Sequence, residues 1–91
     1  MPYIRELLFD DWNVEHIAGH HVLPEEIREV CYSAPFFSRA RQGRLRVIGQ
    51  TEAGRYLIVI LAPQGRGVYY PVTARDASRA ERRRYQRWRN R

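Results

Sequence analysis

Two histidines spaced one helical turn apart are the first residues that suggest chemistry. His16 and His20 are four positions apart, and side chains at this spacing share one face of a helix. An imidazole takes up and releases protons near neutral pH, so both are candidate proton-transfer groups. The spacing also suits metal ligands, but no motif supplies an acidic third ligand. A structural or solvent-facing role is the alternative for both.

Two arginines at predicted strand ends are candidates for binding a phosphate. The planar guanidinium group can contact two phosphate oxygens and stays charged at physiological pH. Arg55 opens an apolar run and Arg75 follows a later strand pattern. We expect both on one face of a sheet, near the last helix, as catalytic residues. The alternative is that they are solvated arginines at strand ends.

Glu81 and Tyr85 are one helical turn apart in the predicted last helix. They are candidates for a catalytic base and a hydrogen-bond donor. The alternative is that Glu81 pairs with Arg84 or Arg55 and that Tyr85 only caps the core.

The C-terminal end is strongly basic, because seven of the last thirteen residues are arginine. Interleaved aromatic side chains offer stacking surfaces for unpaired bases. An exposed run of charge also occurs as a plain solvated face. The predicted RNA-binding residues are Arg79, Arg82, Arg83, Arg87, Trp88 and Arg89.

The charge of the whole chain points to an anionic partner. All sixteen basic residues are arginine, and the formal net charge is +6. Residues 1–37 hold two arginines and seven acidic residues, a balance of −5, whereas residues 38–91 hold fourteen and three, a balance of +11. This asymmetry predicts an oriented electrostatic surface.

Three helices are predicted from apolar spacing and capping residues. Asn13 can cap a short helix over residues 13–20. Pro24 suits the first position of a second helix that ends near Tyr32. A basic helix is expected over residues 77–88, with Ala77, Ala80 and Trp88 on its apolar stripe and Tyr85 at its edge.

Between the second and third helices, the pattern changes to that of strands. Leu45 to Ile48, Arg55 to Leu61 and Val68 to Val72 predict an antiparallel meander, joined by glycine-bearing loops at residues 51–54 and 63–67. Pro71 cannot donate to a ladder, so its strand is placed at an edge or an irregularity. Residues 36–41 are a possible fourth strand. The fold class is therefore α+β in a single domain, residues 1–91, with two N-terminal helices, a three- to four-stranded antiparallel sheet and a C-terminal basic helix.

Four segments together resemble the BrnT-like toxins of type II toxin-antitoxin systems. The segments are Trp12–Val22, Pro24–Val30, Gly49–Val59 and Val72–Tyr85. The resemblance implies a fold related to the RelE-like ribonuclease toxins and neutralisation by a small antitoxin. Many members carry an asparagine and a lysine-histidine-glycine run at the end of the first helix. This chain has His16 and Gly19-His20-His21 there, so only His20 carries over and the lysine's role does not.

These observations predict a ribonuclease toxin that cleaves RNA by attack of the 2′-hydroxyl, without metal or organic cofactor. The predicted catalytic residues are Arg55, Arg75, His20, Glu81 and Tyr85. RNA and a cognate antitoxin are the expected partners, and an acidic antitoxin segment could occupy the basic surface. The first alternative is a non-catalytic RNA-binding or ribosome-associated module, and the second is a protein-interaction domain.

Cellular location is predicted from cysteine usage and hydropathy. Cys31 is the only cysteine, which suits a reducing compartment. The longest apolar stretch, residues 56–62, is too short to cross a bilayer, and no secretory signal pattern is present. A cytoplasmic protein with no membrane association is expected.

Overall fold

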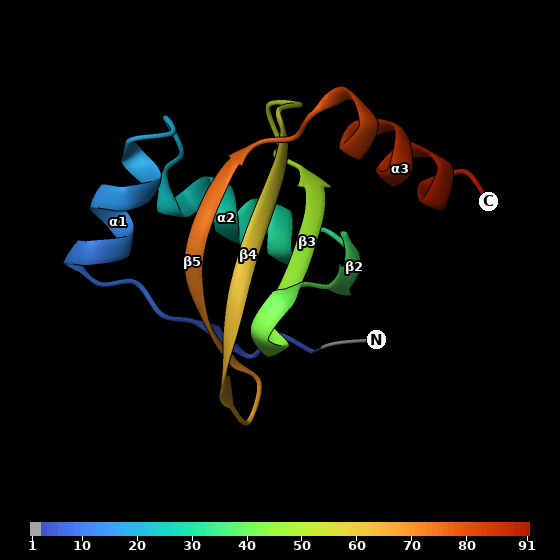
Figure 1. The fold of residues 1–91 in the computed structure, drawn as a ribbon. Helices are drawn as coiled ribbons and strands as arrows, with labels where there is room; N and C mark the ends of the chain where they lie inside the picture. Colours follow the sequence, from blue (N-terminus) through green and yellow to red (C-terminus); the bar gives the residue numbers. More distant parts are fainter. Residues whose placement is uncertain (1–2) are drawn as a thin grey trace.

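A computed structural model describes residues 3–91 and shows an α+β fold (Figure 1). The elements in chain order are β1 (Glu6–Leu7), α1 (Asp11–Ala18), α2 (Pro24–Cys31), β2 (Phe36–Arg39), a 3-10 turn (Arg41–Gly43), β3 (Leu45–Gln50), β4 (Tyr56–Gly65), β5 (Val68–Asp76) and α3 (Arg79–Arg89). No helix within residues 3–91 has the length and apolar character needed to span a bilayer.

The strands form one five-stranded mixed sheet in the order β1-β5-β4-β3-β2. The strand β4 is central, as predicted, and β2 to β5 pair in antiparallel fashion. The prediction of a three- to four-stranded antiparallel sheet is wrong in one respect, because β1 adds a fifth strand that is parallel to β5. A two-residue strand is too short to show an alternating pattern, so it could not be recognised in the sequence.

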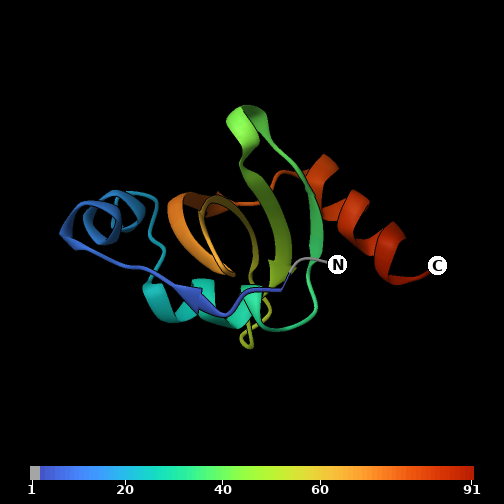
Figure 2. The same ribbon diagram turned by 90° about the horizontal axis from the view of Figure 1, so that it is seen from below.

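The two faces of the sheet are covered differently, as Figure 2 shows. On one face Leu57, Val59 and Leu61 pack against α1 and α2, forming a core that includes Ile17 and Ile27. Of the helices in residues 3–91, only α3 lies on the opposite face, towards one end (Figures 1 and 2). The part of that face not covered by α3 is called the open face below.

The first helix begins two residues earlier than predicted. Asp10, not Asn13, is its N-cap, and the two side chains form a reciprocal capping box. The Asn13 amide group is fully buried and donates to the carbonyl oxygens of Leu8 and Pro71, each at 3.0 Å. A buried amide needs such partners, and these bonds fasten α1 to β5.

The second helix matches its prediction, with Ile27, Val30 and Cys31 on its buried face. The third helix starts at Arg79, and Ser78 and Glu81 form its capping box. Its buried residue is Tyr85, whereas Ala80, predicted in the apolar stripe, is exposed.

The predicted loop at residues 63–67 is a shorter turn. The strands β4 and β5 remain paired as far as Gly65 and Val68, and Arg66 and Gly67 make the turn with φ of 57° and 79°. Pro71 lies at an irregularity, as predicted, because the register shifts beside it.

Candidate functional site

A cavity of about 220 Å³ lies on the open face beside α3. Its floor consists of Ile48 from β3 and of Ile58 and Ile60 from β4. These residues alternate with core residues on the same strands, so β4 carries apolar side chains on both faces. The apolar floor places any bound group in a partly desolvated setting.

Three arginines from three different elements line this cavity: Arg46 from β3, Arg75 from β5 and Arg84 from α3. Strand alternation explains the first two, because Arg46 shares a face with Ile48, and Arg75 is the cross-strand partner of Ile58. Glu81 is the only acidic residue in the lining. The site is therefore suited to an anion.

Arg75 is held in place by Glu81. Its two terminal nitrogens contact the two carboxylate oxygens at 2.8 and 3.0 Å, and one of them also donates to the carbonyl oxygen of Asp76. Such a two-point contact fixes the guanidinium plane. The Arg75 side chain is still 49% exposed, so a ligand can reach it.

Glu81 is already fully engaged. The hydrogen bonds from Arg75, which outweigh partial burial, and those from Ser78 lower the pKa of Glu81 to about 2. Its carboxylate also accepts from the Ser78 backbone N–H at 2.7 Å. A carboxylate with so low a pKa is a weak base near neutral pH, and these contacts favour a role in positioning Arg75.

Tyr85 belongs to a small aromatic core under α3. It is 2% exposed, meets the Tyr56 ring edge-to-face and accepts a hydrogen bond on its hydroxyl from Arg89 at 2.9 Å. It is not among the residues that line the arginine cavity. The alternative that it caps the core fits this location.

Arg55 does not share the open face with Arg75, contrary to expectation. Its Nε donates to Asp76 at 2.8 Å, and one terminal nitrogen contacts Glu26 of α2 and the carbonyl oxygen of His21. The other terminal nitrogen lies 3.4 Å from the carbonyl oxygen of His20. Arg55 thus ties the start of β4 to the helix-covered side, and its contacts are those of a structural clamp.

Of the two candidate histidines, His16 contacts a residue of the cavity lining, although it does not itself line the cavity. Its Nε2 lies 3.2 Å from the Oγ1 of Thr73, a residue of the cavity lining. The His20 ring meets the His16 ring edge-to-face with centroids 5.7 Å apart, and Trp12 stacks on His16 from the other direction. The sequence resemblance selected His20, yet it is His16 that contacts the lining.

The predicted RNA-binding residues lie on or beside the exposed surface of α3. Arg79, Arg82 and Arg83 border a shallow hollow, and Arg82 also lies over the Tyr56 ring at 4.4 Å. Arg87 and Arg89 are exposed at the C-terminal end of the helix. The arginines of α3 are exposed, whereas Tyr85 is buried and Glu81 and Trp88 are half-buried.

Trp88 is half-buried, with its ring against Tyr85 and Phe36. It therefore serves the small aromatic core and presents only part of its ring to solvent.

Sequence reasoning did not select three of the polar residues in the cavity lining: Arg46, Thr73 and Arg84. A signal existed for Arg46, because it alternates with apolar residues in a strand whose neighbour is apolar on both faces. Thr73 and Arg84 carried no such signal, since their position depends on strand register and on where α3 crosses the sheet.

The fold and the site define an α+β domain with an arginine-lined cavity on an open sheet face. Comparison with protein-family models, with curated proteins and with solved structures gave no match. Within residues 3–91, no group of three or more His, Cys, Asp or Glu side chains is arranged to hold a metal ion. Burial raises the pKa of the Cys31 thiol to about 12, which makes this thiol unreactive near neutral pH.

Proposed function

We propose that this protein is an RNA-cleaving toxin of the BrnT-like kind, with a RelE-like fold, that acts on RNA in the cytoplasm and is restrained by an antitoxin. The observation that carries the proposal is the convergence of Arg46, Arg75 and Arg84 on one cavity. Guanidinium groups from three elements can surround a phosphate, which is the repeating group of RNA. The net charge of +6 supports the same choice of partner.

In the proposed reaction, the ribose 2′-oxygen attacks the adjacent phosphorus, and the bond from phosphorus to the 5′-oxygen breaks. The arginines stabilise the negative charge that develops on the phosphate oxygens. His16 accepts the 2′-hydroxyl proton, and water supplies the proton that the 5′-oxygen takes up. The products are a 2′,3′-cyclic phosphate and a 5′-hydroxyl end, and the step needs no oxidant or reductant.

Of the three arginines, Arg75 is the best preorganised to contact a phosphate. Glu81 fixes its guanidinium plane and leaves about half of the side chain accessible. A preoriented donor stabilises a transition state more than a mobile one, because no reorganisation is needed during the reaction.

A non-catalytic RNA-binding module is the second candidate, and two observations favour it. The low pKa of Glu81 and the burial of Tyr85 leave both poorly suited to proton transfer at the cavity. Cleavage then depends on His16, which contacts the lining only through Thr73.

Incubation of purified protein with end-labelled RNA separates the two candidates. We expect cleavage by the wild type, with cyclic phosphate ends on the products. His16→Gln should abolish most of it while retaining a hydrogen-bonding group beside Thr73, and His20→Gln is the matched control that should change it little. RNA retention without cleavage would select the binding module, and neither activity would favour a protein-interaction domain.

The restraint by an antitoxin needs a separate test in cells. Expression of the protein alone should arrest growth, and co-expression of an adjacent gene product should relieve the arrest. Growth arrest that Arg75→Ala does not weaken would contradict a toxic role for the cavity.

A further inference from the structure

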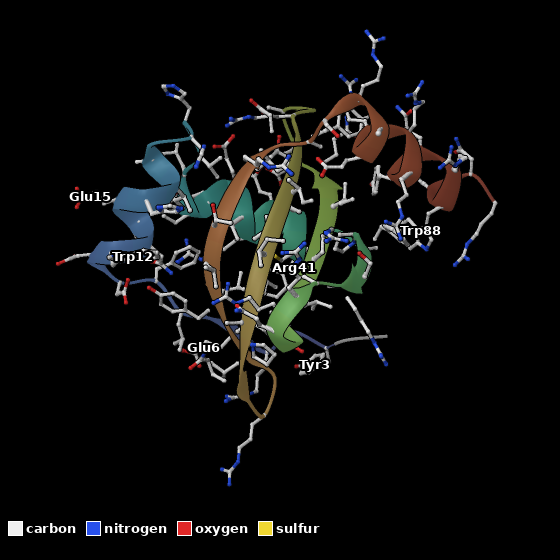
Figure 3. The ribbon with its side chains drawn as sticks, viewed as in Figure 1. Tyr3, Glu6, Trp12, Glu15, Arg41 and Trp88 are labelled. Carbon is white, nitrogen blue, oxygen red and sulfur yellow. The ribbon has the colours of Figure 1, made fainter. Side chains whose placement is uncertain are left out.

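An exposed aromatic ring on α1 has no role in either core. Trp12 is 59% exposed, although tryptophan is usually highly buried because of its large apolar ring. Its indole lies parallel to the His16 imidazole, with centroids 5.0 Å apart and ring planes within 5°. Figure 3 shows Trp12 projecting from α1, far from Trp88 on α3. The result is a flat aromatic surface held in one orientation.

This aromatic surface is connected to the arginine cavity. Trp12 stacks on His16, and His16 in turn contacts Thr73, which lines the cavity together with Arg75. The His20 ring abuts His16 edge-on and limits its rotation. One side chain therefore separates the exposed indole from the cavity lining.

The charges around Trp12 restrict what can bind there. Asp10, Asp11 and Glu15 are its neighbours on or before α1, and no arginine lies on this helix. Carboxylates repel a phosphate but not an uncharged ring. A nucleic acid at this place would therefore present a base to α1 and its phosphate to the cavity.

The surroundings of Trp12 also argue against an extended apolar contact with a protein. Val14, the other large exposed apolar residue of α1, is two positions away, and side chains at that spacing do not share a helix face. The indole is thus a single ring among carboxylates, which suits one stacked base better than an apolar protein surface.

We propose that Trp12, supported by His16, is a stacking platform for one unpaired base of single-stranded RNA whose neighbouring phosphate occupies the arginine cavity. The inference rests on the proposed function, since it takes the cavity ligand to be an RNA phosphate. A base within a duplex is already stacked on both sides, so the platform selects single strands.

The test uses short 2′-O-methyl oligonucleotides, which lack the attacking hydroxyl and stay intact during binding. One carries bases, and its partner has the same backbone with abasic positions. Trp12→Ala should weaken binding of the first by about tenfold or more, as loss of a stacking ring does. It should leave binding of the abasic strand unchanged. Trp12→Phe should restore most of the affinity, and Arg46→Ala should weaken both strands.

A second readout follows the indole itself. In a Trp88→Phe background Trp12 is the only tryptophan, and its fluorescence should be quenched by the strand with bases but not by the abasic strand. The platform would be overturned if both strands quenched the fluorescence alike. It would also be overturned if Trp12→Ala and wild type bound the strand with bases equally well. Binding by Arg46→Ala would still test the cavity in either case. If neither strand binds the wild type, the proposed function itself fails.

Discussion

Arg75 combines a fixed orientation with access from solvent, and this combination makes it the central residue of the site. It meets Glu81 through two hydrogen bonds and remains about half exposed above an apolar floor. Arg46 and Arg84 add charge to the same cavity, but no ion pair within residues 3–91 holds either of them. The three arginines therefore differ in how well they are preorganised.

The first prediction is that Arg75→Ala lowers the cleavage rate by roughly two orders of magnitude, as removal of one oriented donor can do. RNA affinity should fall by less than about tenfold, because Arg46 and Arg84 still neutralise the phosphate. Single-turnover cleavage and equilibrium binding measure the two effects. The control is Glu81→Gln, which frees the guanidinium but keeps its charge and should give an intermediate rate. Undiminished cleavage by a folded Arg75→Ala variant would exclude a catalytic role for Arg75.

The second prediction concerns Glu81 and acid stability. Its pKa is about 2 in the folded protein, below its ordinary value of 4.5, so the ionised form stabilises the fold. This stabilisation is fully present above the ordinary value and is lost as the pH falls towards 2. The difference in thermal midpoint between wild type and Glu81→Gln should therefore shrink between pH 5 and pH 2. Asp10 and Asp76 also have lowered pKa values, and both are present in wild type and in Glu81→Gln, so they lower the thermal midpoints of the two proteins alike in acid. A difference in midpoint that stays constant between pH 5 and pH 2 would contradict the prediction.

At the scale of the elements, Arg55 links the β3–β4 connection to α2 through hydrogen bonds and ion pairs. This side chain contacts Asp76 at the end of β5, Glu26 of α2 and the loop that follows α1. It is only 26% exposed and draws together three segments that are distant in sequence. Its role is thus to hold the end of the sheet against the helices.

The third prediction is that Arg55→Ala lowers the free energy of unfolding by about 2 kcal/mol, because its hydrogen bonds to charged groups are removed and the carboxylates of Glu26 and Asp76 lose the arginine that pairs with them. Chemical denaturation measures this decrease. Arg41→Ala is the matched control, since Arg41 is exposed in the 3-10 turn and has no ion pair within residues 3–91. RNA cleavage by the folded fraction of Arg55→Ala should match that of wild type. If Arg55→Ala abolished cleavage without changing stability, the prediction that Arg55 is a catalytic residue would be supported instead.

Sequence patterns were enough to predict most elements but not which face of the sheet each candidate occupies. Alternation identified β3 and β5, a continuous apolar run identified β4, and Pro24 identified the start of α2. The face of Arg75 follows from its pairing with Ile58, which depends on the turn at residues 66–67 and on the two register shifts between that turn and Arg75. The loop predicted over residues 63–67 does not fix how β4 and β5 pair, so the sequence could not assign Arg75 to a face.

Contacts between segments that are distant in sequence could not be predicted from local patterns either. The bonds from Asn13 to Pro71 and from His16 to Thr73 join residues more than fifty positions apart. They depend on where α1 packs along β5, which no local pattern records. The choice between His16 and His20 could therefore be made only from the structure.

At the scale of the whole molecule, the acidic N-terminal helices and the basic C-terminal helix lie on opposite sides. The helices α1 and α2 lie on the side opposite α3, which carries the arginine-rich surface (Figures 1 and 2). Carboxylates dominate the charged residues of the first two helices. The molecule thus has one basic side, which would suit an anionic partner.

The fourth prediction is a steep salt dependence of RNA binding, because each neutralised phosphate releases condensed cations. Replacing Arg83 and Arg87 with glutamine should lower the slope of log K against log salt by about 0.7 for each phosphate that is no longer neutralised. Both arginines are exposed on α3, and neither is among the cavity lining. Titrations at several salt concentrations measure the slope. A flat response of the wild type would remove the electrostatic basis of the proposal, and an unchanged slope in the double variant would exclude α3 as an RNA-binding surface.

The parallel pairing of β1 with β5 also sets an order of events during synthesis. Glu6 pairs with Val68, more than sixty positions later, so β1 cannot pair until β5 has been synthesised. The arginine cavity needs β3, β5 and α3 together, and residues 75–91 take about one to three seconds to add at typical elongation rates. A growing chain therefore lacks this site until α3 has been made and has left the ribosome, even though β3 and most of the sheet are already present.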